Sequence, residues 1–138
     1  MKQVVIFSLL VTLAFPAYPV GKADRLTVKR VRVDAHDPNG FQRAWVEFNG
    51  TITNSPSCVT NAGHKKRFGI RLDTPDGRAA YSMVLSALNT GSTMLVIGLG
   101  TCTIYNNIIE DWHYGYLYAP GVSPDEAVVD EDDDEPID

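Results

Sequence analysis

The chain has 138 residues, 44% of them hydrophobic, and a formal net charge of −5. This length holds one ordinary domain and little else. Residues 24–120 contain ten Lys/Arg and eight Asp/Glu, and so weak an excess of positive charge does not favour a nucleic-acid partner.

The N-terminus has the pattern of a secretion signal. Lys2 precedes an apolar run over residues 4–14, which is shorter than the roughly 20 residues of a membrane span. The small residues Gly21 and Ala23 suit signal peptidase and predict cleavage after Ala23. We interpret residues 1–23 as a signal peptide and the mature protein as secreted or periplasmic, without a membrane span after cleavage. An uncleaved anchor is the alternative.

The first strand is expected over residues 26–33. Its alternation changes phase, because the apolar residues up to Val28 share one face and those from Val31 share the other. A β-bulge near Lys29-Arg30 reconciles the two phases and lets one strand serve two faces of a curled sheet.

Two further strands precede the helix. The strand expected over residues 43–53 has the clearest alternation in the chain. Its even-numbered residues form the core face, whereas Trp45 lies on the opposite face among polar neighbours. A strand over residues 67–72 turns its apolar residues inward and Arg67 and Arg71 outward.

A single helix and a fourth strand follow. Thr74–Gly77 is expected to be a turn ahead of the helix, and Gly91 suits the left-handed residue that ends many helices. Helical spacing gathers four apolar residues on one face, namely Tyr81, Val84, Leu85 and Leu88. Residues 94–99 are apolar on both phases, so this strand is expected to be covered on both faces.

The fifth strand is expected over residues 108–118. On one phase it carries an aromatic stripe that consists of Trp112, Tyr114, Tyr116 and Tyr118. Five strands, with the helix between the third and the fourth, predict a mainly β fold over residues 24–120, a small five-stranded OB-like Greek-key barrel. The alternative is an open α+β sheet packed on one helix. Residues 121–138 hold nine acids and no base and are expected to form a disordered acidic tail.

Cys58 and Cys102 are the two cysteines of the chain. In an exported protein an even pair indicates a disulfide, and its loop of about 45 residues is worth on the order of 4 kcal/mol in the loop-entropy description. The alternative, a reactive or metal-binding thiol pair, lacks the close spacing of such sites.

The aromatic stripe is the first candidate binding site. Aromatic faces stack on the C–H faces of sugars, and a strand holds the rings at alternate positions. Trp45 joins them if the second and fifth strands present the same surface. The alternative is that the stripe fills the barrel or covers its outside against the helix.

A basic run is the second candidate, an anion-binding patch formed by Lys65, Lys66, Arg67 and Arg71. One alternative is a solvated strand edge that its charges keep from aggregating. Another is a patch that the acidic tail folds back upon and screens.

Neither a catalytic nor a metal site is predicted, and no cofactor is expected. Glu110 and Asp111 are adjacent in one strand and point to opposite faces, which is poor geometry for acid–base catalysis. The sequence has no G-x-S-x-G elbow and no H-E-x-x-H motif. One turn clusters Asp34, His36, Asp37 and Asn39, but turn chemistry explains these residue types without a cation.

Residues 81–102, YSMVLSALNTGSTMLVIGLGTC, resemble those of small secreted bacterial OB-fold-like proteins of unknown function. More distantly they resemble the OB-fold B subunits of bacterial AB5 toxins, especially those of the subtilase-cytotoxin type. The resemblance implies an exported OB-like domain with a disulfide, and for the toxin subunits it implies glycan binding by a pentamer. From this resemblance only the disulfide cysteines carry over to this chain, as Cys58 and Cys102, and no sugar-contacting residue does.

The sequence thus predicts a secreted, non-enzymatic binding module whose first expected ligand is a carbohydrate. The alternative is a protein-interaction or inhibitor module of the bacterial envelope. An oligomer is compatible with either role.

Overall fold

The computed structural model describes residues 19–34 and 40–121. The predicted signal sequence up to residue 18 and the acidic tail from residue 122 lie outside the described residues. Within them are five strands, one α-helix and a short 3-10 helix. Their bounds are β1 (Lys22–Asp34), β2 (Arg43–Phe48), η1 (His64–Lys66), β3 (Arg67–Arg71), α1 (Pro75–Thr90), β4 (Thr93–Gly98) and β5 (Glu110–Leu117).

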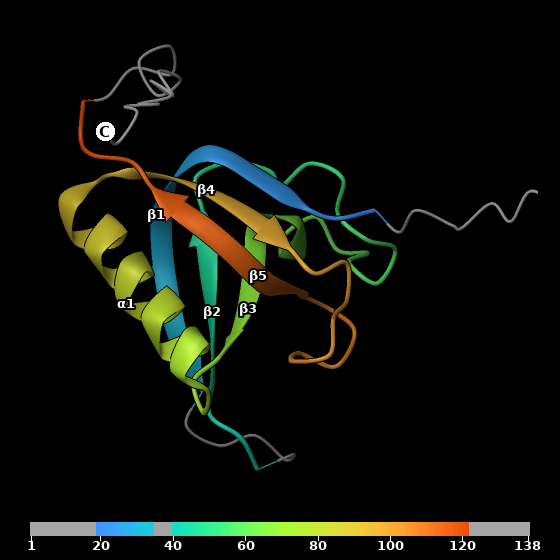
Figure 1. The fold of residues 1–138 in the computed structure, drawn as a ribbon. Helices are drawn as coiled ribbons and strands as arrows, with labels where there is room; N and C mark the ends of the chain where they lie inside the picture. Colours follow the sequence, from blue (N-terminus) through green and yellow to red (C-terminus); the bar gives the residue numbers. More distant parts are fainter. Residues whose placement is uncertain (1–18, 35–39, 122–138) are drawn as a thin grey trace, which may run out of the picture.

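The strands close into a barrel in the order β1-β2-β3-β5-β4 (Figure 1). Neighbouring strands run antiparallel, except for the parallel pair of β3 and β5. The helix α1 follows β3 in the sequence and packs against β1, β3 and β5. The predicted fold class, a small five-stranded OB-like barrel with one helix, is therefore confirmed, and the sheet is closed rather than open.

β1 serves two sides of this barrel. Its first part pairs with β4 and its second part with β2. The register shifts between Val28 and Arg30, which confirms the predicted bulge. A second shift, between Ala23 and Leu26, coincides with a positive φ of 50° at Arg25.

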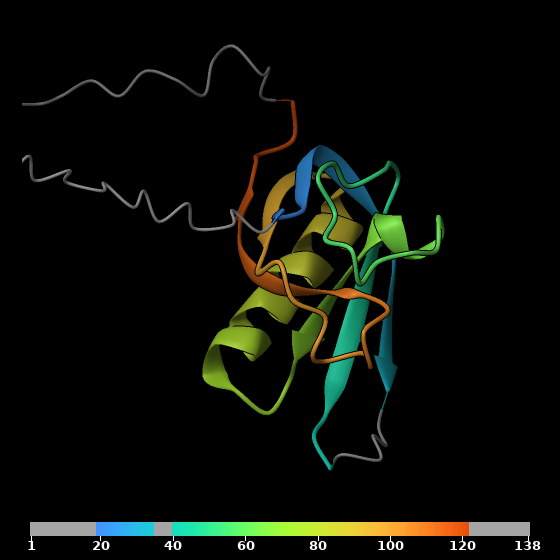
Figure 2. The same cartoon turned by 90° about the vertical axis from the view of Figure 1, so that its right-hand side faces the viewer.

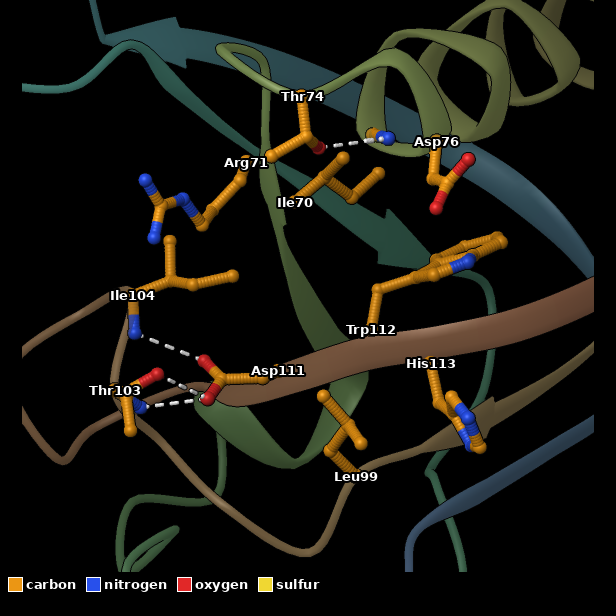
Figure 3. Close-up of a pocket in the computed structure, with 11 residues that line it drawn as sticks. Ile70, Arg71, Thr74, Asp76, Leu99, Thr103, Ile104, Asp111, Trp112 and His113 are labelled. Atoms are coloured by element: carbon orange, nitrogen blue, oxygen red, sulfur yellow. Dashed lines mark hydrogen bonds between the residues drawn. The ribbon is translucent and has the colours of Figure 1, made fainter.

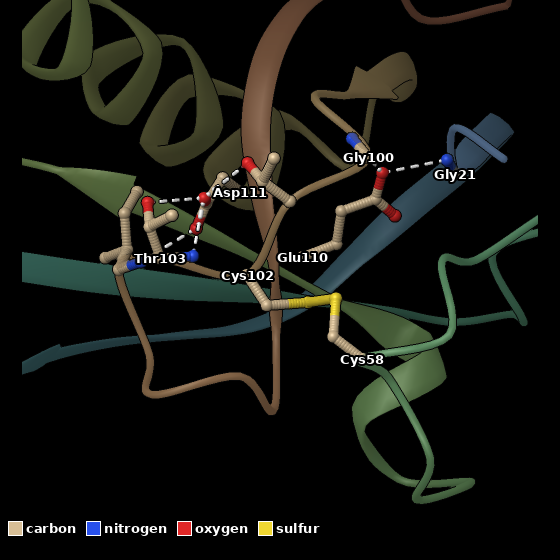
Figure 4. Close-up of a disulfide and its surroundings, with 9 residues drawn as sticks. Gly21, Cys58, Gly100, Cys102, Thr103, Glu110 and Asp111 are labelled. Atoms are coloured by element: carbon tan, nitrogen blue, oxygen red, sulfur yellow. Dashed lines mark hydrogen bonds between the residues drawn. A yellow bond between two sulfur atoms is a disulfide. The ribbon is translucent and has the colours of Figure 1, made fainter. Parts of the chain in front are cut away.

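The folded domain begins before Asp24, the first residue after the predicted cleavage position. β1 starts at Lys22, and both Gly21 and Ala23 are buried. The Gly21 N–H donates a hydrogen bond of 2.8 Å to the carboxyl group of Glu110 (Figure 4). The residues just ahead of Asp24 are thus part of the barrel wall.

α1 begins earlier than the sequence suggested. Thr74 is its N-cap, and the side-chain oxygen of Thr74 accepts a hydrogen bond of 3.1 Å from the Gly77 N–H. Pro75 is the first helical residue, where its missing N–H costs no hydrogen bond. Thr74–Gly77 is therefore the cap and first turn of α1, and Gly91, with a φ of 71°, ends the helix as predicted.

The buried face of α1 is narrower than predicted. Val84 and Ala87 are fully buried, and Tyr81 packs against the same core. Leu85 and Leu88 remain exposed. The prediction that they share one face with Tyr81 and Val84 is wrong, because the helix touches the curved barrel along one line and the residue that follows each buried position turns away from it.

β4 is well covered on one face. Met94 and Val96 point inward and are fully buried, whereas Leu95 and Ile97 point outward and are partly exposed. The expectation of burial on both faces is wrong, because α1 packs mainly against β1, β3 and β5.

A bulge in β5 divides the predicted aromatic stripe. The register against β4 shifts by one residue at His113, between Trp112 and Tyr114. The Trp112 ring packs on the core and meets the Phe68 ring edge to face at 6.3 Å. Tyr114 and Tyr116 point outward and are 45% and 58% exposed. The prediction of one common face is therefore wrong.

A second apolar cluster lies outside the barrel, on β2 and β3. Trp45 is buried there against Ile104, Tyr105 and Ile109 of the loop between β4 and β5, which crosses in front of β2 in Figure 2. Gly69 pairs with Trp45 across the two strands, and a Cβ at Gly69 would lie 3.0 Å from the Tyr105 ring. Trp45 is thus buried although its neighbours on this face are polar, because the loop covers it.

Candidate functional site

A cavity of about 280 Å³ opens beside the N-terminus of α1 (Figure 3). β5 contributes Trp112 and His113 to its lining, β3 contributes Ile70, and α1 contributes Asp76. In Figure 3 the Asp76 carboxylate and the Trp112 indole lie on the same side of the cavity. The lining combines an aromatic wall with a few hydrogen-bonding groups, which is the usual composition of a small-molecule site.

Asp111 borders the cavity, but both oxygens of its carboxylate accept hydrogen bonds from the loop that follows β4. Oδ2 accepts hydrogen bonds from the Thr101 hydroxyl at 2.8 Å and from the Thr103 N–H and hydroxyl, both at 2.7 Å. Oδ1 accepts a further bond from the Ile104 N–H at 2.9 Å. Asp111 therefore fixes the loop that follows β4, and its oxygens are already engaged.

The predicted disulfide between Cys58 and Cys102 is confirmed (Figure 4). It joins the loop ahead of η1 to the loop that follows β4. The cover over Trp45 is therefore held by the disulfide, by Asp111 and by the Tyr105 hydroxyl, which donates a hydrogen bond to Asp34 of β1.

Glu110 lies on the other side of β5, in a niche between glycines. Its Oε1 accepts hydrogen bonds from the N–H groups of Gly21 at 2.8 Å and Gly100 at 3.0 Å. A Cβ at Gly98 would lie 2.1 Å from that oxygen. Burial raises the pKa of Glu110 and outweighs the two N–H bonds, which lower it. Glu110 and Asp111 thus point to opposite sides of β5, as predicted.

Three tyrosines follow one another along the outer side of β5 and its end, and we call Tyr114, Tyr116 and Tyr118 the tyrosine strip. The His113 ring meets the Tyr114 ring at 5.0 Å, and Tyr114 meets Tyr116 at 6.0 Å, both edge to face. The Arg25 guanidinium lies 4.3 Å over the Tyr118 ring. Because His113 also lines the cavity, it connects the cavity to the strip.

The two tryptophans predicted to share the aromatic site lie elsewhere. Trp112 forms one wall of the cavity. Trp45 is separated from β5 by β3 and lies in the outer apolar cluster. The sequence therefore identified the rings that gather around β5 but not which of them face solvent.

Most of the cavity lining was not predicted as a site, including two residues that carry hydrogen-bonding groups, Asp76 and His113. Asp76 belongs to the first turn of α1, which the sequence pattern predicted to be a separate turn ahead of the helix. The order Thr74-Pro75 is a known start signal for a helix and locates Asp76 at its N-terminus. His113 is isolated in the sequence, and no local pattern reveals that it is the bulged residue of β5.

The predicted anion patch is divided between a strand and a loop. Arg67 and Arg71 lie on the same outward face of β3. Lys65 and Lys66 lie in η1 and are exposed. Arg71 is paired with Asp73, so its charge is partly compensated.

The turn that was considered for a cation is described only in part. The residues outside the described part are His36, Asp37 and Asn39. Asp34 is engaged, because it accepts hydrogen bonds from the Tyr105 hydroxyl at 3.0 Å and from Arg32 at 2.7 Å. Over residues 19–34 and 40–121, no three His, Cys, Asp or Glu side chains gather to hold a metal ion. In that same part of the chain, no helix is long and apolar enough to cross a membrane.

Comparison with protein-family models, with curated proteins and with solved structures finds no match for this chain. The resemblance to AB5 toxin B subunits stays a prediction. Function therefore has to be inferred from the geometry of the cavity and of the surfaces around it.

Proposed function

We propose that this chain is an exported binding module that takes up a carbohydrate at the cavity and along the tyrosine strip. The observation that supports this most is the exposure of Tyr114 and Tyr116 beside the cavity, while Phe48 and Phe68 fill the core. Tyrosine rings held by a strand present flat, rigid surfaces with little side-chain entropy to lose on binding.

A sugar ring requires two kinds of contact, stacking for its C–H face and hydrogen bonds for its hydroxyls. The tyrosine strip supplies the stacking surface. Asp76, Thr103 and His113 supply hydrogen-bonding groups at the cavity. At about 280 Å³ the cavity is small for a ligand pocket. We therefore expect one sugar unit in it and neighbouring units over Tyr114 and Tyr116.

The carboxylates near the cavity support binding rather than catalysis, because the fold already engages two of them. A catalytic acid or base has to reach the substrate within hydrogen-bond distance. The Asp111 oxygens are engaged by the loop after β4, and Glu110 is enclosed by glycines on the other side of β5. Asp76, the other carboxylate of the lining, is left to accept hydrogen bonds from sugar hydroxyls.

An exported location is supported by the Cys58–Cys102 disulfide. Disulfides persist in oxidising compartments and are rare in the cytosol of most organisms. We therefore propose that the protein acts in the periplasm or outside the cell.

The test is a glycan array probed with the oxidised protein and with Asp76→Asn. We expect the wild-type protein to bind a defined set of glycans and Asp76→Asn to bind them at least about fivefold more weakly, since a charge-assisted hydrogen bond is lost. Asp24→Asn is the matched control, because neither Asp24 nor its ion-pair partner Lys22 lines the cavity. A wild-type protein that binds no glycan on the array overturns the proposal.

A protein partner is the second candidate. Leu95 and Ile97 lie on the outer face of β4, paired with Tyr116 and Tyr114, and both stay partly exposed. Apolar side chains next to aromatic ones are typical of protein interfaces. This candidate predicts no signal on the glycan array and a co-purifying envelope protein whose capture is lost in Ile97→Ser.

A further inference from the structure

The outer face of β1, β2 and β3 carries a grid of charged side chains. Three rows cross these strands, Arg30–Glu47–Arg67, Arg32–Trp45–Gly69 and Asp34–Arg43–Arg71. We call the five cations of this grid the arginine face, namely Arg30, Arg32, Arg43, Arg67 and Arg71. The tyrosine strip is on β5, and of the arginine face only Arg71 also lines the cavity.

At one end of the arginine face three cations converge on one carboxylate. Arg30 donates from Nε and Nη2 to Glu47 Oε2 at 3.1 and 2.9 Å, and Arg67 donates from Nε at 2.8 Å. Lys29 Nζ lies 3.4 Å from Oε1. Burial on its own would raise the pKa of Glu47, but the hydrogen bonds from Arg30 and Arg67 and the charge of Arg67 lower it to about 2. Glu47 is ionised at neutral pH, and it balances one of these three cations.

At the other end two carboxylates serve three arginines. Asp34 accepts a hydrogen bond from Arg32 at 2.7 Å and lies 4.0 Å from Arg43, and Asp73 is paired with Arg71. With Lys29 included, six cations meet three carboxylates over the whole surface. The excess positive charge is therefore concentrated on one side of the barrel.

Aromatic rings hold four of the guanidinium groups in place. The distances from guanidinium carbon to ring centroid are 4.4 Å for Arg67–Trp45, 5.4 Å for Arg30–Trp45, 4.2 Å for Arg43–Tyr105 and 4.5 Å for Arg71–Phe41. Cation–π contacts of this kind reduce the side-chain freedom that binding would otherwise remove. Trp45 and Tyr105 are only 8% and 5% exposed, so their own faces are closed to a ligand.

We propose that the arginine face binds an acidic polysaccharide through the carboxylate or sulfate groups of its sugar units. Guanidinium groups match these anions with paired N–H bonds. Among the described residues, the Nη nitrogens of Arg67 have no hydrogen-bond partner. Strands lie about 4.8 Å apart in a sheet, so the cations on neighbouring strands are regularly spaced. A polymer with repeated negative charges can therefore bind several of them at once. Single-stranded nucleic acid is a poorer fit, because the rings on which bases would stack are covered.

The experiment measures, by titration calorimetry, the affinity of the full chain for heparin, polygalacturonate, oligothymidylate and the neutral polymer dextran. The test variant is Arg30→Gln/Arg32→Gln, in which the two side chains are 56% and 65% exposed. The matched control is Lys22→Gln/Arg78→Gln, which removes two positive charges outside the arginine face. We expect at least about tenfold weaker heparin or polygalacturonate binding in the test variant and near wild-type binding in the control. Dextran should not bind at this surface, and about 0.5 M salt should remove most of the affinity.

Three outcomes overturn the proposal. Equal losses of affinity in both double variants would show that binding depends on net charge alone. Tighter binding of oligothymidylate than of heparin and polygalacturonate would assign the face to nucleic acid. Absence of binding to both polyanions would show that the face does not bind an acidic polysaccharide. Arg32→Gln alone keeps the ion pairs of Glu47 and repeats the test if the double variant does not fold. Neutral-glycan binding at the tyrosine strip should be the same in all variants, so the proposed function stands or falls separately.

Discussion

Trp112 and Tyr114 are two residues apart on β5, yet their rings lie on opposite sides of the barrel wall. Regular alternation would put them on one face. The bulge at His113 adds one residue between them, so the first ring packs on the core and the second faces solvent. The same bulge directs His113 to a place where it touches both the cavity and Tyr114. The candidate site therefore depends on this irregularity of β5.

We predict that Glu47 makes the fold sensitive to acid. The pKa of Glu47 is lowered from 4.5 to about 2 in the folded state. The carboxylate therefore stabilises the fold above about pH 4.5, and this contribution is lost as the pH falls toward 2. Urea unfolding should show the free energy of unfolding decreasing by about 3 kcal/mol over that window from this group.

Glu47→Gln is the variant that tests this. It should be about 2 kcal/mol less stable at pH 7, because three cations lose their common acceptor, and its stability should vary less between pH 4.5 and 2. Asp73→Asn is the control, since the Asp73–Arg71 pair is much more exposed. If Glu47→Gln and wild type respond equally to acid, the assigned role of Glu47 is wrong.

Much of the fold was predictable because it depends on neighbours in the sequence. Alternation identified the core faces of β2 and β3, the phase change at Lys29-Arg30 identified the bulge in β1, and Gly91 marked the end of α1. The faces of Leu85 and Leu88 were not predictable, because they depend on how the helix lies across a curved barrel.

The site was less predictable because its parts are far apart in the chain. The burial of Trp45 depends on Tyr105, sixty residues later, and on the space above Gly69. None of this was predicted, because the pairing of Trp45 with Gly69 and the apolar residues around Tyr105 gain their meaning only once the strands and the loop are in place. The bulge at His113 has no local signal either, since the packing of Trp112 on Phe68 decides it.

Removal of the disulfide should loosen the cover over Trp45 as well as destabilise the fold. For Cys58→Ser/Cys102→Ser we expect a loss of up to about 4 kcal/mol in the free energy of unfolding. In a Trp112→Phe background the fluorescence reports Trp45 alone, and its emission should shift to longer wavelength when the loop moves away. Emission that stays unchanged in the folded double variant would show that the hydrogen bonds of Asp111 and of the Tyr105 hydroxyl hold the loop without the disulfide.

We expect the mature protein to start at or before Gly21, rather than at Asp24. Cleavage after Ala23 would remove the hydrogen bond from the Gly21 N–H to Glu110 and the first two β1–β4 pairs. The intact mass of the exported protein gives the cleavage position directly. Mature protein that begins at Asp24 and unfolds at the same temperature as a form beginning at residue 19 would contradict this expectation.

The acidic tail should compete with polyanions for the arginine face. Deletion of residues 121–138 removes nine acids and no base. We predict tighter heparin binding by the shortened protein at low salt, with the difference fading at high salt as charges are screened. Identical heparin affinities of the two forms at low salt would rule out screening by the tail.

The central claim is that the exposed rings of β5 bind a sugar. The most direct measurement is the calorimetric affinity of the best array glycan for wild type, Tyr114→Ala, Tyr116→Ala and the control Leu85→Ala, whose side chain is similarly exposed on α1 at 41%. Each tyrosine variant should lose about tenfold or more in affinity without a change in melting temperature, and Leu85→Ala should bind as wild type does. Wild-type affinity in both tyrosine variants would contradict the claim.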